Sequence, residues 1–306
     1  MGDVSLLERP VQVVSGKGGV GRSTVAAALA LRSARAGHRT LVLEVDAPDS
    51  VTRLLGAPPA PDRPREIEPN LWACRMTPSG ALEEYAQLVL RVKLVYKLVF
   101  ENNLVRYLLR FIPSLAEVTM LGKMWWHATQ DEIRKGEPRF ERIILDAPAT
   151  GHSITFLSVA RTVADVSPAG ILKEQAEKMA QMVESSVMHV VALPEEMPVN
   201  EGLELFGAIP SRLRIEPGLA IVNRRSPSLL EEGESEQLGA LEGRDGVGAY
   251  VRAARRRLDR EGLEAEHAGR FFEGAPGRGL ILFESSESGR ALVEAVADAL
   301  EAELGS

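Results

Sequence analysis

The chain has 306 residues, of which 45% are hydrophobic and 26% are charged, a composition that excludes intrinsic disorder and suffices for a buried core. Its 43 acidic and 36 basic residues give a formal net charge of −7, so we expect no general attraction to nucleic acid or to an anionic membrane. The single cysteine, Cys74, excludes an intrachain disulfide and a paired-cysteine zinc site, and we expect a partly buried, inert thiol.

The sequence predicts neither a leader nor a membrane span. Its first ten residues, MGDVSLLERP, include acidic side chains and only a short apolar stretch, unlike a secretory signal. The most apolar window, residues 88–100, is interrupted by Arg91, Lys93 and Lys97, whereas a spanning helix needs about 18 apolar residues. We therefore expect a cytoplasmic protein with no transmembrane segment.

Short runs of Val, Ile and Leu recur along the chain, each followed by a glycine-rich, proline-rich or polar turn. Such continuous apolar runs are typical of strands in a parallel sheet that is buried on both faces. Helical patterns lie between most of them, so we predict one α/β domain over residues 1–306 with a doubly wound, mainly parallel sheet. The predicted strands are residues 11–14, 41–45, 143–145, 187–193, 219–222 and 279–283.

The first strand leads directly into a glycine-rich turn and an alanine-rich helix, in the segment VQVVSGKGGVGRSTVAAALALRSARAG. This context makes a phosphate-binding loop credible, because backbone N–H groups and the helix start converge on phosphate oxygens. The pattern G-x-x-x-x-G-K-[ST] runs from Gly16 to Ser23, with Arg22 at the lysine position. We predict that a nucleotide is bound by Gly16, Gly18, Gly19, Val20, Gly21, Arg22, Ser23 and Thr24.

The side chain of Arg22 keeps the positive charge but replaces a compact ammonium by a longer, planar group. We therefore expect nucleotide binding to survive and hydrolysis to be slow.

The second strand ends in acidic residues, in RTLVLEVDAPDSVTRLLG. A carboxylate at the carboxyl edge of the sheet can orient and partly deprotonate an attacking water. Glu44 and Asp46 both stand at this position, and Glu44 is open between a role in the site and an ordinary strand-end acid.

A helical insert is predicted from about residue 81 to 135. Within it, LVLRVKLVYKLVF (residues 88–100) is apolar nearly all round a helix and must be buried on several sides. It either packs within a helical subdomain or offers an apolar patch to a partner subunit or a hydrophobic client. The sequence does not decide between these.

The next strand ends in RIILDAPATGHSITFL, residues 142–157. Asp146 follows an aliphatic run, as a Walker B aspartate does, and we predict that it holds Mg²⁺ opposite the Ser23 hydroxyl. For His152 we expect a structural or relay role rather than that of a general base.

Two features remain in the C-terminal part. The segment 229–248 is poor in apolar residues and is expected to be a mobile surface loop. The arginines that follow it have acidic neighbours, so we expect a solvated helix face rather than a site for nucleic acid or phospholipid. They are Arg252, Arg255, Arg256, Arg257 and Arg260.

The motifs together resemble a known family. KGGVGRST resembles the deviant Walker A loop KGGxGK[ST] of the ATPases that include ParA, MinD, nitrogenase iron protein and the arsenical-pump ATPases. DAPATGHSITFL resembles the second switch of the ArsA and tail-anchored-protein-targeting (GET) ATPases, and much less that of ParA or MinD. GLAIVNRRSPS carries the family's VN pair. The resemblance spans nearly the whole chain and implies a P-loop NTPase fold.

The resemblance implies specific roles. Lys17 would be catalytic by reaching the nucleotide of a second subunit, so that ATP is sandwiched in a dimer. Asp46 falls on the carboxylate assigned to the water. Gly151 would offer its N–H to the γ-phosphate and move on hydrolysis, and Asn223 would read the adenine base. For Asn223 an ordinary turn-forming asparagine is the alternative.

The chain also departs from the family. Arsenical-pump ATPases often have two tandem halves, whereas this chain has one phosphate loop, so the active form should contain two chains. It lacks the CxxC clasp of eukaryotic GET ATPases and any cysteine cluster for arsenite. Met179 and Met182, which lie where GET ATPases carry a methionine-rich insert, are expected to be core residues.

We expect a dimeric, nucleotide-switched ATPase that binds and slowly hydrolyses Mg·ATP to control a protein partner or client. Its pairing partner is a second copy of the chain or a paralogous ATPase subunit. One alternative is a catalytically impaired regulatory subunit that pairs with an active paralogue, suggested by Arg22 and by EVD in place of STD at the first switch. Another is a positioning switch like ParA or MinD.

Overall fold

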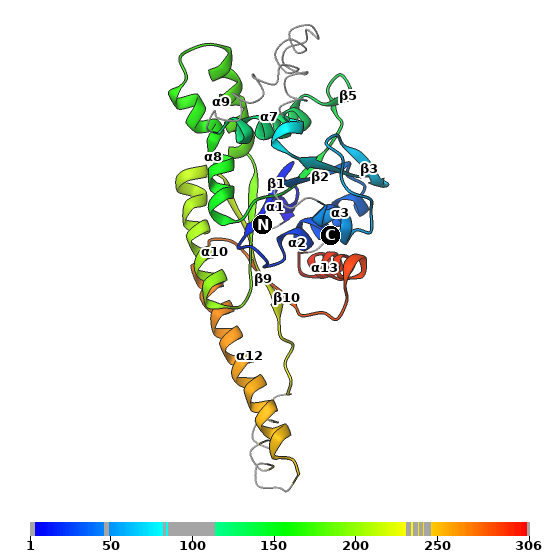
Figure 1. Ribbon diagram of the computed structural model, residues 1–306, viewed down its shortest axis with the longest axis vertical. Helices are drawn as coiled ribbons and strands as arrows, with labels where there is room; N and C mark the ends of the chain where they lie inside the picture. Colours follow the sequence, from blue (N-terminus) through cyan, green and yellow to red (C-terminus); the bar gives the residue numbers. More distant parts are fainter. Residues whose placement is uncertain are drawn as a thin grey trace.

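The computed structural model describes residues 4–45, 49–81, 84, 114–230, 234, 238, 241 and 246–304. Within them the chain forms an eight-stranded sheet of order β10-β9-β8-β1-β7-β2-β4-β3 (Figure 1). All neighbouring strands are parallel except β3 and β4. The strands are β1 (Val11–Gly16), β2 (Thr40–Val45), β3 (Arg65–Glu68), β4 (Leu71–Met76), β7 (Arg142–Asp146), β8 (Val187–Ala192), β9 (Glu216–Arg225) and β10 (Gly279–Phe283).

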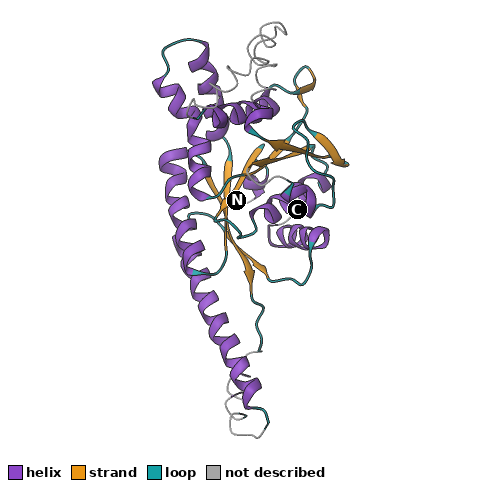
Figure 2. Cartoon of the chain, in the orientation of Figure 1, coloured by secondary structure: helices purple, strands orange, loops and turns teal. Residues whose placement is uncertain are grey.

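Helices cover both faces of this sheet (Figure 2). They are α1 (Val4–Leu7), α2 (Arg22–Arg35), α3 (Ser50–Leu54), α7 (Leu115–Thr129), α8 (Thr150–Val166), α9 (Ile171–Glu184), α10 (Glu196–Ala208), α12 (Gly248–Gly274) and α13 (Gly289–Leu304). A π-helical turn, η1 (Ile209–Leu213), follows α10, and a small ribbon is formed by β5 (Glu132–Arg134) and β6 (Glu137–Pro138). The predicted doubly wound, mainly parallel α/β fold is confirmed.

The core lies in two layers, one on each face of the sheet. Side chains alternate between them along each strand, so that Val13 joins one layer and Val14 the other. One layer is completed by α7 to α10 and the end of α12, and the other by α2, α3 and α13. All six residues of each of β1, β2 and β8 are buried, which is why these strands are rich in apolar residues in the sequence.

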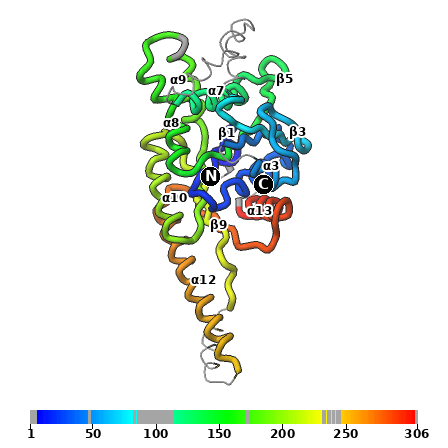
Figure 3. Tube along the Cα trace, viewed as in Figure 1, coloured from blue at the N-terminus to red at the C-terminus, as the bar shows by residue number. Residues whose placement is uncertain are grey.

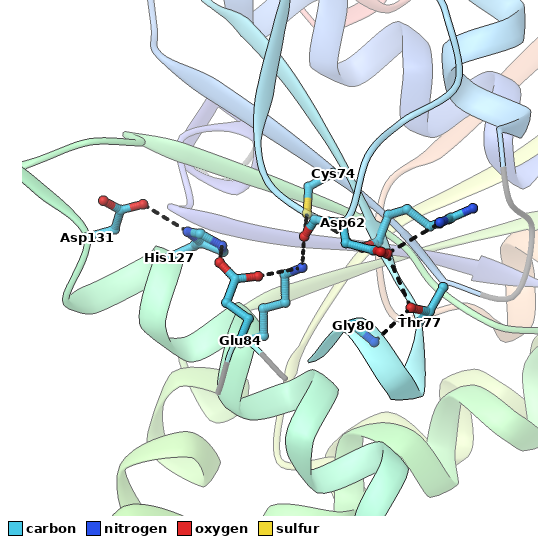
Figure 4. Close-up of polar contacts among 9 residues, drawn as sticks. Asp62, Cys74, Thr77, Gly80, Glu84, His127 and Asp131 are labelled. Atoms are coloured by element: carbon cyan, nitrogen blue, oxygen red, sulfur yellow. Dashed lines mark hydrogen bonds and ion pairs between the residues drawn. The ribbon is translucent and has the colours of Figure 1, made fainter. Parts of the chain in front are cut away.

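Buried polar side chains of α7 hold the described part of the predicted insert together and join it to the segment before β3 (Figure 4). The Lys123 ammonium is fully buried, forms an ion pair with Glu84 at 2.8 Å and donates to the Asp62 carbonyl. On the same helix, His127 Nδ1 lies 2.9 Å from a carboxylate oxygen of Asp131. Residues 82–83 and 85–113, with the apolar window 88–100, lie outside the described residues, so the insert's boundaries stay a prediction.

Two expectations about sulfur-containing residues are confirmed. Cys74 of β4 is a free, buried cysteine whose Sγ donates to the Asp62 carbonyl at 3.2 Å, and burial raises the pKa of its thiol to about 11. At that pKa almost no thiolate forms at neutral pH, so the thiol is unreactive. Met179 and Met182 are buried in the core.

Helix α12 extends well beyond the sheet (Figure 3). Its last turns pack against α10 through Phe271, which contacts Phe206 with ring centroids 5.8 Å apart. Farther out, Arg257 pairs with Glu261 at 2.9 Å and Arg260 with Glu264 at 2.7 Å, in agreement with the expected solvated face. The loop predicted before it is described only at its ends and at three isolated positions, so most of that prediction lies outside the described residues.

Among the described helices, none combines the length and the apolar composition needed to cross a bilayer.

Candidate functional site

The predicted loop leaves the sheet between two inner strands. β1 lies between β7 and β8, with Val14 opposite Asp146 and Gly16 opposite Val191. β2 continues the sheet beside β7, with Glu44 opposite Asp146. Because these strands are parallel, their carboxyl ends meet at one edge, where open α/β sheets bind ligands.

Close contacts leave no room for a side chain at two glycines of the loop. Gly16 has φ +152°, and a Cβ there would overlap the Val191 carbonyl oxygen. Gly21 has φ +99°, and a Cβ there would overlap the side-chain amide of Asn223. By contrast, a Cβ on Gly18 or Gly19 would meet nothing within 4 Å, so this part of the loop faces open space. The backbone is therefore held against the protein at both ends and accessible between them.

Helix α2 begins immediately after Gly21. No side chain caps its N-terminus, so its first backbone N–H groups have no intrahelical acceptor and lie beside the loop. Together with the dipole of a 14-residue helix, these donors favour an anion at this position.

Ser23 and Asp146 are in direct contact. The Ser23 hydroxyl donates to Asp146 Oδ2 at 2.6 Å, and Asp146 is only 1% exposed. Burial raises the pKa of Asp146 to about 6, although the Ser23 hydrogen bond and the Arg22 charge oppose the shift. A buried carboxylate beside a hydroxyl is an oxygen donor pair of the kind that suits Mg²⁺. The described residues hold no group of three or more His, Cys, Asp or Glu placed for a metal.

Arg22 is anchored at the same edge of the sheet. Its guanidinium donates through Nη1 to the carbonyl of Ala147, the residue after Asp146. The positive charge of Arg22 thus lies beside the predicted metal position.

Lys17 points toward α10, where its ammonium forms an ion pair with Glu201. The other carboxylate oxygen of Glu201 accepts a hydrogen bond from the Thr150 hydroxyl at 3.1 Å. Hydrogen bonding from Lys17 holds the pKa of Glu201 below its usual range, although its partial burial opposes this. Glu201 was not predicted from the sequence, because it lies 184 residues from Lys17 in an ordinary helix.

The predicted second switch begins helix α8. Gly151 and His152 lie in its first turn and are exposed. The next residue, Ser153, is buried and lies with its hydroxyl 3.0 Å from that of Ser15, at the end of β1. These two serines connect the loop strand to α8 and were not predicted.

Asn223 lies next to the loop, near the end of β9. Its side-chain amide donates from Nδ2 to the Val20 carbonyl at 2.8 Å, and its Oδ1 accepts from the Arg224 N–H at 3.0 Å. The side chain is buried and holds the loop in place. Whether it also reads adenine stays a prediction.

Glu44, which the sequence left open, is engaged with the backbone. It is 1% exposed and accepts the N–H groups of Asp49 at 2.7 Å and Thr52 at 2.8 Å, which organise the start of α3. Burial raises the pKa of Glu44. The predicted catalytic carboxylate, Asp46, lies outside the described residues.

The structure thus brings the predicted loop, Asp146, Gly151 and Asn223 to one edge of the sheet, with Lys17 on the side of α8 and α10. This arrangement can hold a phosphate chain on backbone N–H groups and a divalent cation beside the buried carboxylate of Asp146.

Comparison with known proteins agrees with this geometry. The sequence model of the family described as anion-transporting ATPase (ArsA ATPase) matches residues 10–206. ATPase BagA of Mycobacterium tuberculosis is 30% identical over 229 residues, which are 72% of this chain and 66% of the relative. The arsenical pump-driving ATPase of Escherichia coli is 27% identical over 248 residues, 76% of this chain and 39% of the relative. The chain therefore spans just under two thirds of the mycobacterial protein and well under half of the pump ATPase.

Proposed function

The chain belongs to the anion-transporting ATPase family, and on that basis we propose that it binds Mg·ATP at the loop Gly16–Thr24 and hydrolyses it slowly as a nucleotide-dependent dimer. The observation that carries the proposal is the contact between the Ser23 hydroxyl and Asp146, at the end of a loop in which Gly16 and Gly21 have no room for a side chain. A loop of this kind without the buried carboxylate would bind an anion but not organise a metal.

The proposed roles follow from the positions of the groups. The loop N–H groups and the start of α2 hold the β- and γ-phosphates. Ser23 and Asp146 hold Mg²⁺, which would neutralise phosphate charge when bound. Asp46 orients the attacking water and Gly151 donates its N–H to the γ-phosphate. Lys17 acts across the pair on the second nucleotide.

We propose a protein partner or client, rather than arsenite, as the output of the cycle. The names of several relatives refer to an arsenical pump, but the only thiol of this chain is Cys74, which is buried and has a raised pKa. The pairing partner is a second copy of the chain or a paralogous ATPase subunit, acting in the cytoplasm.

One observation favours a second candidate, a regulatory subunit that binds nucleotide with little turnover. The guanidinium of Arg22 donates a hydrogen bond to the Ala147 carbonyl. A lysine at this position would instead project a compact ammonium over the loop. A subunit of this kind would bind Mg·ATP and pair with an active paralogue, which would perform the hydrolysis.

Calorimetry with Mg·ATP tests the proposal. Gly21→Ala places a Cβ against the Asn223 amide at φ +99° and should weaken binding by at least about tenfold. The matched control is Gly207→Ala in α10, where a Cβ meets nothing within 4 Å, and its affinity should equal that of the wild type. A wild type that does not bind Mg·ATP, or equal affinities for both variants, contradicts the site. Phosphate release by the wild-type chain alone and with a paralogous subunit separates the two candidates.

A further inference from the structure

One carboxylate joins three segments of the proposed site. Glu201 of α10 is paired through Oε1 with the Lys17 ammonium and accepts the Thr150 hydroxyl on Oε2 at 3.1 Å. Lys17 belongs to the phosphate-binding loop, and Thr150 is the first residue of α8 and precedes Gly151. The loop, the start of α8 and α10 are thus held together by a single side chain.

This contact lies on an open face of the chain. Gly18 and Gly19 of the loop and Gly151 at the start of α8 are exposed, and Met197, one turn before Glu201 on α10, is 58% exposed. We refer to these four residues as the loop face. The side chains of the ion pair are 34% and 27% exposed, so a molecule docking on the loop face could reach them without unfolding the core.

The position of Lys17 is incompatible with a role in a second subunit as long as Glu201 holds it. A lysine that reaches the phosphates of a second nucleotide has to leave the carboxylate on its own α10. A triphosphate carries more negative charge than a carboxylate, so it can replace Glu201 as the partner of the ammonium once the two copies meet. The same exchange frees one oxygen of Glu201 and removes the restraint on Thr150.

We propose that Glu201 is a positioning residue that restrains Lys17 and the start of α8 in the unpaired chain, and that its release by the nucleotide of a second copy makes pairing dependent on ATP. This inference rests on the proposed function and adds its regulation. Lys17 thus has two arrangements, one paired with Glu201 and one paired with the second nucleotide. The equilibrium between them is shifted by the second nucleotide and by the first turn of α8. An ordinary exposed ion pair, by contrast, would have little effect on pairing.

The test uses the full chain and light scattering over a titration with Mg·ATP. Glu201→Gln keeps the shape and the acceptor for Thr150 but removes the charge that holds Lys17, so half-maximal pairing should occur at an ATP concentration lower by at least about threefold. Glu201→Asp shortens the side chain and should shift the midpoint in the same direction. Glu204→Gln, an exposed position on the same helix, makes the same charge change but keeps the carboxylate that pairs with Lys17, and should leave the midpoint unchanged. Thermal melting checks that every variant is folded.

A double-variant cycle tests whether Glu201 acts through Lys17. In a Lys17→Ala background, Glu201→Gln should no longer change the ATP dependence of pairing, whereas a general effect of surface charge would persist. Hydrogen exchange of the first turn of α8 should be faster in Glu201→Ala, which also removes the Thr150 acceptor, than in Glu201→Gln.

Two outcomes overturn the inference, and they are distinguishable. If the wild type binds Mg·ATP and pairs, but Glu201→Gln and Glu201→Asp pair at the wild-type ATP concentration or fail to pair, Glu201 does not restrain pairing and only this inference is wrong. If the wild type does not pair with Mg·ATP at all, there is no pairing for Glu201 to control, and the proposed dimer is wrong as well.

Discussion

Replacing Asp146 by asparagine should stabilise the protein while removing its metal site. Asp146 is a buried carboxyl group whose pKa is raised to about 6, mainly by burial, so ionisation is less favourable in the folded chain than in the unfolded one. Asparagine has no charge to bury, and its carbonyl oxygen can still accept the Ser23 hydroxyl. The variant should therefore unfold less readily than the wild type at neutral pH.

The size and the pH window of this effect follow from the pKa. A rise from 3.8 to about 6 corresponds to about 3 kcal/mol of lost stability for the ionised wild type. Below about pH 4 the carboxyl is protonated in both states, and Asp146→Asn gains little. As the pH rises from 4 to 6, the Asp146 carboxyl ionises in the unfolded wild type before it ionises in the folded one. The difference in free energy of unfolding in favour of the variant therefore grows, and it becomes constant above about pH 7.

Urea unfolding at pH 4.5, 6 and 8 in the presence of EDTA measures this difference, with Asp298→Asn on the exposed side of α13 as the control. Saturating Mg·ATP should then stabilise the wild type and leave Asp146→Asn almost unaffected, because ligand binding stabilises only the chain that binds. An asparagine variant that is less stable than the wild type at pH 8, or an advantage that does not change with pH, would refute the reasoning.

Three further substitutions have defined outcomes. Arg22→Lys restores a compact ammonium and should raise the rate of phosphate release; rapid turnover by the wild type that this change abolishes would contradict the expectation. Glu264→Ala removes the acceptor of three hydrogen bonds and should lower the free energy of unfolding by about 2 kcal/mol in urea, whereas the exposed Glu266→Ala should have almost no effect. Asn223→Ala removes the bond to the Val20 carbonyl and should weaken Mg·ATP binding in calorimetry; an unchanged affinity would show that the loop is held without it.

The inner strands of the sheet were predictable because a strand that is buried on both faces is rich in apolar residues. β1, β2 and β8 consist of buried residues throughout, and a run of Val, Ile and Leu is a local signal. β4 was not predicted because its sequence, LWACRM, contains no run of Val, Ile and Leu and includes a charged residue, Arg75. β3 is an edge strand with exposed charges and has no apolar run at all.

In the candidate site, too, local sequence patterns were predictable, whereas contacts between distant segments were not. The phosphate loop and Asp146 are local patterns, in which neighbouring residues carry the chemistry, and the structure places them together. Glu201 could not be predicted, because its contact with Lys17 depends on how α10 packs beside β1. For Glu44 the sequence supplied two interpretations, and the hydrogen bonds to the backbone of α3 assign it a structural role.

The proposal that Mg·ATP joins two copies of the chain is tested most directly by the mass in solution. Light scattering of the wild type at saturating Mg·ATP should give twice the mass of the single chain. The mass should return to that of one chain when EDTA is added, and Lys17→Ala should pair weakly under the same conditions. A wild-type chain that keeps the mass of a monomer at saturating Mg·ATP, both alone and mixed with a paralogous subunit, would contradict the proposal, because Lys17 would then have no second nucleotide to reach.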